Sequence, residues 1–121
     1  MKYGMIAVIA FAGLASAALA AGDPMAAAYE NTVVSTDETG GQSKVMYNAD
    51  HTYTVIRPDG AAGKGTWSIK DGQLCVNRTE PVPPVNFCMG LDGIPSQVGD
   101  SKQTTTTDGR KFTNTMTAGR S

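Results

Sequence analysis

Two cysteines and a single histidine are the residues of this chain with the most distinctive chemistry. Cys75 and Cys88 have twelve residues between them, whereas zinc knuckles and redox dithiols place two residues between their cysteines. His51, the other residue type that often binds metals, is distant in sequence from both. We therefore expect a Cys75–Cys88 disulfide, with no metal site and no cofactor.

His51 is also the obvious candidate for a general base, but no catalytic partner set surrounds it. A general base needs a nucleophile or water and an orienting group, and the serines and threonines are scattered without a strand-to-helix elbow. A copper site using His51 and methionines is disfavoured because the chain has no Met-x-x-Met cluster. Four aspartates are each followed by glycine, which indicates turns: Asp59, Asp71, Asp92 and Asp108. We expect a protein that is not an enzyme.

The first twenty residues differ sharply in composition from the rest. Sixteen of them are apolar and Lys2 is their only charge, whereas 33 of the other 101 residues are apolar. Lys2, the apolar stretch 5–15 and the small residues Ala18 and Ala20 form the pattern of a secretory signal peptide. The apolar stretch is shorter than the roughly 20 residues that span a membrane. The sequence predicts a signal peptide over 1–20, cleaved before Ala21, without a stable membrane anchor.

The remaining segment, 21–121, has the length of one domain. It carries nine basic and eleven acidic residues and no basic run, which argues against nucleic acid and anionic lipid as partners. A soluble bacterial protein, periplasmic or secreted, is expected, and its partner would be another protein or a small apolar ligand. An oxidising compartment is also where a disulfide persists.

Short alternating runs punctuated by Asp-Gly predict β-hairpins throughout this domain. The expected strands are 29–37, 43–49, 52–57, 64–70, 73–79, 85–91, 101–107 and 110–117. Asp23-Pro24 predicts a short helix just after the signal peptide. The fold class is all-β: a small antiparallel meander of 6–8 strands that closes into a barrel or a strongly curled sheet, with a sandwich as the alternative. The Thr-rich segment 101–121 is expected to be a polar edge hairpin or partly disordered.

Two independent arguments fix the register of the central strands. A two-residue turn at Asp71-Gly72 pairs Trp67 with Val76, and a disulfide across neighbouring strands pairs Val76 with Phe87. Both registers place the same side chains on one apolar face: Trp67, Ile69, Leu74, Val76, Phe87 and Met89. A one-residue slip would mix the two faces. This face is the predicted core and a possible ligand-facing surface, and its bulk is expected to fill a barrel interior.

The tip of the disulfide-closed hairpin is a second place where binding is conceivable. It consists of Glu80, Pro81, Val82, Pro83 and Pro84. A proline-rich tip is stiff and therefore loses little conformational freedom on binding. A plain connecting loop is the simpler interpretation.

Gly65-Thr66-Trp67, followed by Leu74-Cys75 and then Cys88, resembles the pattern of a group of small exported proteins of alphaproteobacteria that have no assigned activity. The resemblance implies export and a β-rich fold. Gly65-Thr66-Trp67 is also similar to the Gly-x-Trp of lipocalin-like barrels, although in lipocalins that motif lies on the first strand. A third likeness, in architecture alone, is to small periplasmic protease inhibitors.

We therefore expect an exported, non-enzymatic binding or structural protein. One alternative is a lipocalin-like carrier of a small apolar ligand. Another is an inhibitor of an exported protease, in which the segment 23–30 or the tip 79–84 would protrude.

Mass spectrometry of the exported protein tests the predicted cleavage. A mature mass that begins near Ala21 is expected, because the small residues of the signal lie three and one positions before it. A mass that retains Met1 would contradict the prediction.

Overall fold

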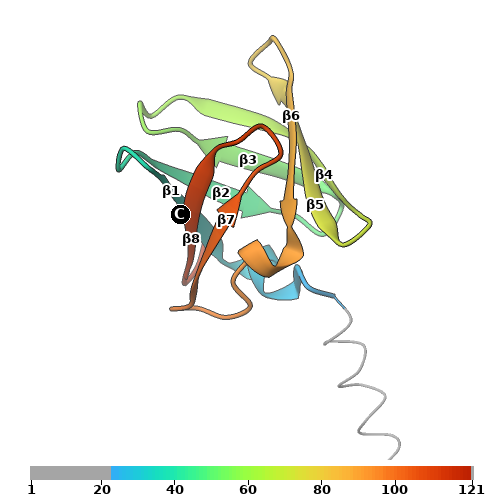
Figure 1. Cartoon of the computed structure of the whole chain (residues 1–121), viewed down its shortest axis with the longest axis vertical. Helices are drawn as coiled ribbons and strands as arrows, with labels where there is room; N and C mark the ends of the chain where they lie inside the picture. Colours follow the sequence, from blue (N-terminus) through green and yellow to red (C-terminus); the bar gives the residue numbers. More distant parts are fainter. Residues whose placement is uncertain (1–22, 121) are drawn as a thin grey trace, which may run out of the picture.

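The computed structural model describes residues 23–120, which form one eight-stranded antiparallel sheet curled nearly into a barrel (Figure 1). The predicted signal peptide lies outside the described residues. All eight predicted strands are present, which confirms the all-β class: β1 (Thr32–Asp37), β2 (Gln42–Tyr47), β3 (Thr52–Ile56), β4 (Ala62–Lys70), β5 (Gln73–Glu80), β6 (Val85–Gly90), β7 (Ser101–Thr105) and β8 (Lys111–Thr117). Two short 3-10 helices accompany them, η1 (Ala26–Glu30) and η2 (Leu91–Gly93). Neither has the length and apolar character that crossing a membrane requires, and no other helix occurs among these residues.

The strands follow an up-and-down order, β6-β5-β4-β3-β2-β1-β8-β7. Short turns join most consecutive strands, so neighbours in sequence are neighbours in the sheet. The β4–β5 turn shows why: Asp71 and Gly72 both have positive φ, 52° and 77°, as a two-residue hairpin turn of this type demands. The β1–β8 pairing then brings the end of the chain back to its beginning.

The predicted register of the central strands is confirmed. Trp67 pairs with Val76 and Val76 with Phe87, while Cys75 lies opposite Cys88. Trp67, Leu74, Val76 and Met89 are buried, whereas Ser68 and Gln73 on the opposite face are exposed. The alternation therefore decided which side of the sheet turns inward.

Ile69 corrects one member of the predicted core, since its side chain is 39% exposed. The pairing of β3 with β4 ends at Thr52 and Thr66, so Ile69 lies on a part of β4 that extends past its neighbour toward the turn. Its face was predicted correctly, but no second layer covers it there.

A β-bulge bends the sheet between β4 and β5. Their register shifts between Lys64 and Gly65, and a bulge of this kind increases local twist and curvature. The two strands approach so closely that a Cβ at Gly65 would lie 2.0 Å from the carbonyl oxygen of Asn77. Glycine is therefore required at this position for the curvature that closes the barrel.

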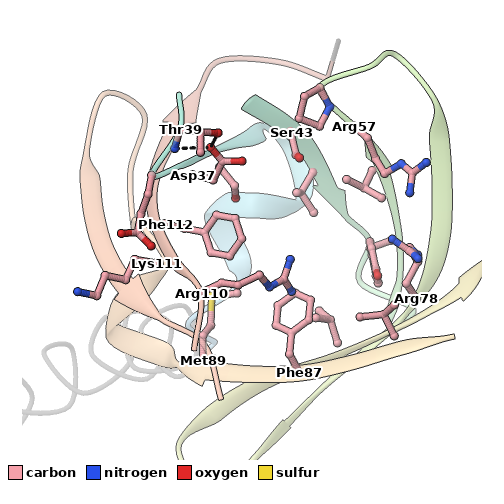
Figure 2. A pocket seen from close by; sticks show the side chains of 18 of the residues that line it. Asp37, Thr39, Ser43, Arg57, Arg78, Phe87, Met89, Arg110, Lys111 and Phe112 are labelled. Atoms are coloured by element: carbon pink, nitrogen blue, oxygen red, sulfur yellow. Dashed lines mark hydrogen bonds between the residues drawn. The ribbon is translucent and has the colours of Figure 1, made fainter. Parts of the chain in front are cut away.

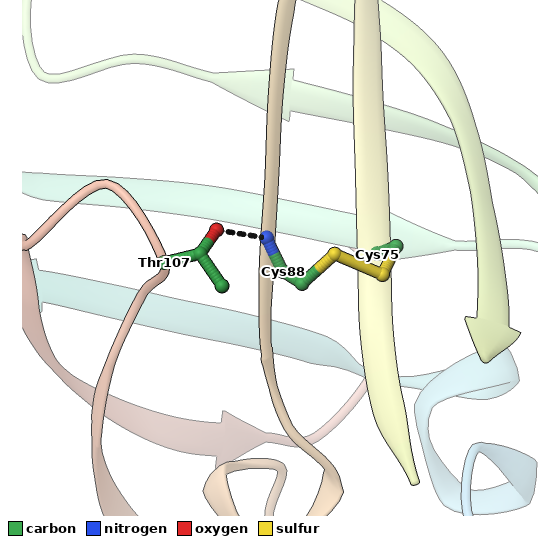
Figure 3. Close-up of a disulfide and its surroundings, with 3 residues drawn as sticks. All are labelled: Cys75, Cys88 and Thr107. Atoms are coloured by element: carbon green, nitrogen blue, oxygen red, sulfur yellow. Dashed lines mark hydrogen bonds between the residues drawn. A yellow bond between two sulfur atoms is a disulfide. The ribbon is translucent and has the colours of Figure 1, made fainter. Parts of the chain in front are cut away.

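Cys88 of β6 is hydrogen-bonded to Thr107, in the turn between β7 and β8, and Figure 3 shows one of the two bonds. The N–H of Thr107 donates to the carbonyl oxygen of Cys88 at 2.9 Å, and the N–H of Cys88 donates to Oγ1 of Thr107 at 3.0 Å. Because both backbone groups of Cys88 face Thr107, Cys75 and Cys88 are a non-hydrogen-bonded pair, with Cα atoms 4.0 Å apart. Side chains come closest at such pairs, which suits the observed disulfide.

The N- and C-terminal segments together close one end of the barrel. The predicted helix after Asp23 is the single 3-10 turn η1, and the predicted strand 29–37 begins only at Thr32. A carboxylate oxygen of Asp23 accepts a hydrogen bond from the N–H of Met25, which is fully buried. Arg120 then donates to the carbonyl oxygens of Ala28 and Tyr47, at 3.0 and 2.8 Å, so it ties η1 to β2.

The Thr-rich segment forms the β7–β8 hairpin. Its first strand, β7, is the polar edge strand that was one of the two alternatives. Its second strand, β8, lies between β1 and β7 and carries Asn114 and Met116, both 1% exposed. The Asn114 amide donates to the carbonyl oxygen of Gly93 at 2.8 Å, so this buried polar group is satisfied.

Removal of the disulfide tests its contribution to stability. Replacing Cys75 and Cys88 together with serine should lower the free energy of unfolding by about 3 kcal/mol, because a closed loop of this length restricts the unfolded chain. Chemical denaturation of the oxidised wild type and the double variant measures the difference. Equal midpoints would show that the disulfide does not constrain the fold.

Gly65→Ala tests the close approach at the bulge. The added methyl group would overlap the β5 backbone, so we expect a loss of at least about 2 kcal/mol in unfolding free energy. Thr66→Ala, at the exposed neighbouring position, is the matched control and should change stability little. Equal thermal midpoints for the two variants would refute the role assigned to Gly65.

Candidate functional site

The interior of the barrel holds a cavity of about 530 Å³. It lies toward the end that carries the β1–β2, β3–β4 and β7–β8 turns, since Glu38, Pro58 and Arg110 are among its lining residues. The opposite end is closed by η1 and Trp67. The cavity is the candidate functional site because its volume falls within the roughly 300 to 1,000 Å³ of small-molecule sites and its lining is mainly apolar.

Most of the cavity wall is apolar or aromatic. The inward alternation of five strands supplies it: Val45 and Tyr47 from β2, Tyr53 and Val55 from β3, Val76 from β5, Val85, Phe87 and Met89 from β6, and Phe112 from β8. The outward positions of the same strands are mostly polar, with Met46 and Ile56 as exceptions, so the apolar surface of the sheet is mainly on its inner face.

The hollow interior corrects the expectation that bulky side chains would fill the barrel. Trp67 and Leu74 are buried but do not line the cavity, while Phe87 and Met89 form part of its wall. The reason lies in β4, whose inward positions before Trp67 are glycines, Gly63 and Gly65, and a glycine contributes no side chain to the interior.

Two tyrosines contribute the hydroxyl groups deepest in the wall. The rings of Tyr47 and Tyr53 lie 6.1 Å apart, and Tyr47 meets Trp67 edge-on at 6.3 Å. Burial raises the pKa of both tyrosines above its usual value, and the positive charge of Arg78 partly offsets this for Tyr53. Both hydroxyls therefore stay protonated at neutral pH and can donate hydrogen bonds into the cavity.

Three arginines lie at the opening of the cavity (Figure 2). Arg57 and Arg78 lie on one side of it, and Arg110 projects toward its middle from the β7–β8 turn. The guanidinium carbon of Arg110 lies 4.8 Å from the ring centre of Phe87 and 5.2 Å from that of Phe112. These cation–π contacts hold Arg110 across part of the opening.

The acidic residues at the opening are largely engaged in their own turns. Asp37 accepts hydrogen bonds from the N–H groups of Thr39 and Gly41, both at 2.9 Å, and from the Thr39 hydroxyl at 2.7 Å. The Thr39 hydroxyl bond is the largest cause that lowers the pKa of Asp37. Asp108 holds Nε of Arg110 at 3.0 Å. Its own pKa is lowered, first by the hydrogen bond from the Thr106 hydroxyl.

Arg57 and Arg78 have fewer hydrogen-bond and ion-pair partners than Arg110. In each, Nε is buried and has no hydrogen-bond partner among residues 23–120. Arg57 makes a long ion pair with the exposed Asp59, at 3.9 Å, and Arg78 makes no ion pair with any described residue. Buried polar groups in native proteins are nearly always paired, so these two side chains mark the polar part of the site.

No family model, curated protein or solved structure matches this chain. What it binds must therefore be argued from the cavity and its opening.

The other residues singled out in the sequence lie elsewhere. His51 has a positive φ of 72° in the β2–β3 turn, stacks on Trp67 at 4.1 Å between ring centres, and does not line the cavity. The tip Glu80–Pro84 stands at the open end of the barrel, and its five residues are exposed. Asp59, Asp71 and Asp108 lie in hairpin turns, as expected, and Asp92 lies in η2.

Arg57 and Arg78 were not among the residues predicted from the sequence, although the alternation of the strands contains a signal for them. Tyr53 and Val55 alternate inward, and the next step along the strand direction is Arg57. Val76 faces inward, and the next such position is Arg78. The predicted inward face contained only apolar residues, so it did not include these charged side chains at the opening.

Proposed function

We propose that this protein is an exported, non-enzymatic binding protein that carries a small apolar ligand inside its barrel. The observation that supports this most directly is the apolar cavity of about 530 Å³. Eight-stranded barrels of up-and-down topology have an interior just large enough for side chains or for one small ligand. Here glycines in β4 leave the space open.

The arrangement of polar groups favours binding over catalysis. The one histidine of the sequence is stacked on Trp67 at the closed end, and its Nδ1 lies 3.1 Å from the Trp67 carbonyl oxygen. A catalytic step in the cavity would thus proceed without an imidazole base. Tyrosine hydroxyls and guanidinium groups instead offer hydrogen-bond donors, which hold and orient a ligand.

Export is part of the proposal. The Cys75–Cys88 disulfide is of the kind that persists in oxidising compartments, and the first twenty residues have the pattern of a signal peptide. We place the mature protein in the periplasm or outside a bacterial cell. The likeness of Gly65-Thr66-Trp67 to lipocalin-like barrels agrees with a carrier role.

A second candidate function, inhibition of an exported protease, rests on the β5–β6 tip. Val82 is 78% exposed there, and a projecting, proline-flanked apolar side chain is suited to insertion into a partner's pocket. The segment 23–30, the other element considered for this role, is packed against the barrel through Met25 and Ala28. We favour the carrier function, because an apolar cavity is a more specific sign of binding than one exposed side chain in the β5–β6 tip.

Binding of N-phenyl-1-naphthylamine, a neutral apolar fluorophore, tests the carrier function. The wild type should give a saturable increase in fluorescence with one site per chain. Val55→Trp, which fills the cavity, should weaken binding at least about tenfold, because the lost space excludes the probe. Thr54→Trp, on the outward face of the same strand, is the matched control and should bind as the wild type does.

The result is meaningful only for folded variants, so thermal unfolding followed by circular dichroism accompanies each titration. Absence of saturable binding by the wild type, or equal affinities for the two tryptophan variants, would contradict a ligand site inside the barrel.

A further inference from the structure

The cationic side chains at the opening differ in how they are paired. Four of them line the cavity: Arg57, Arg78, Arg110 and Lys111. Arg110 is paired with Asp108, and Arg57 lies 3.9 Å from the exposed Asp59. Arg78 makes no ion pair with any described residue, and Figure 2 shows it on the same side of the opening as Arg57.

The position of Arg78 follows from the glycines of β4. Tyr53, Gly65 and Arg78 lie side by side across β3, β4 and β5. Because Gly65 has no side chain, nothing separates Tyr53 from Arg78 on the inner face. The stem of Arg78 then passes over Gly63, where a Cβ would lie 3.4 Å from its Cδ. The guanidinium is thus directed from the apolar wall toward the opening, where Arg57 lies.

From this geometry we infer that the ligand is amphipathic: an anionic group, of the carboxylate class, binds between Arg57 and Arg78, and an apolar body occupies the cavity below. This inference rests on the proposed carrier function and specifies its ligand. Arg78 has no ion-pair partner among the described residues, and the pair between Arg57 and Asp59 is long, at 3.9 Å; guanidinium donors suit the two oxygens of a carboxylate. The protonated hydroxyl of Tyr53 is a further donor near Arg78.

A small anion or a purely apolar ligand would each match only one part of the cavity. A small anion would satisfy the arginines but leave the apolar surface of Val45, Val55 and Phe87 in contact with water. A purely apolar ligand would fill the cavity but offer no acceptor to the guanidinium groups at the opening, and donors that lose water without gaining a partner weaken binding. A ligand with one anionic end satisfies both parts.

Competition against bound N-phenyl-1-naphthylamine by decanoate and by 1-decanol tests the inference. The two competitors have the same ten-carbon chain and differ in the charge of the head group. We expect decanoate to bind at least about tenfold more tightly, because charge-assisted hydrogen bonds to arginine exceed those of a neutral hydroxyl. Decyltrimethylammonium, with a cationic head, should compete poorly.

Three variants test which residues cause the preference for decanoate over 1-decanol. Arg78→Gln and Arg57→Gln should each weaken decanoate binding about tenfold and 1-decanol binding much less, so that the preference for decanoate is lost. Lys44→Gln, an exposed position on β2 outside the cavity, removes the same charge and should leave decanoate binding unchanged. Thermal unfolding followed by circular dichroism shows that each variant is folded.

The outcomes separate this inference from the carrier function. Equal competition by decanoate and 1-decanol, or failure of both to displace the bound fluorophore, would overturn the anionic head group and leave the carrier function standing. An equal loss in Lys44→Gln would also overturn it, because the effect would then come from overall charge. If the wild type fails to bind the fluorophore at all, the carrier function itself is wrong.

Discussion

The closure of the sheet at Cys88 is the constraint on which the rest of the structure depends. The up-and-down order leaves β6 and β7 as edges, and an open, curled sheet would expose its apolar face to water. Two hydrogen bonds join the backbone of Cys88 to Thr107, in the turn that follows β7, while the disulfide anchors Cys88 to β5. One residue therefore links this turn to the central strands and helps to hold the sheet curled around the cavity.

The same features that close the barrel also leave it hollow. Gly65 permits the close β4–β5 approach that bends the sheet, and together with Gly63 it removes side chains from the inner face of β4. Because Gly65 has no side chain, Tyr53 and Arg78 face each other across β4. In most small domains inward positions are filled to crystal-like density. Here the apolar surface that would have filled the core lines a cavity instead, and the closed end supplies the packed core.

Strand existence, register and the disulfide could be predicted from the sequence, because alternation and Asp-Gly turns are local signals with a strict period. Burial of Ile69 and the contents of the interior could not, because both depend on where neighbouring strands end and how strongly the sheet curls. Arg57 and Arg78 were readable in principle from the alternation. Their position at the opening of a cavity could not be predicted, because it depends on the bulge and on the glycines of β4 in the folded structure.

Nuclear Overhauser contacts between decanoate and the protein test the central claim, that the ligand lies inside the barrel with its head at the rim. The account predicts contacts from the alkyl protons to the inward methyl groups of Val45 and Val55. It also predicts that the carboxylate end lies near the side chains of Arg57 and Arg78. Contacts confined to outward side chains such as Ile56 would contradict it, because the ligand would then bind to the outer surface and the cavity would not be its site.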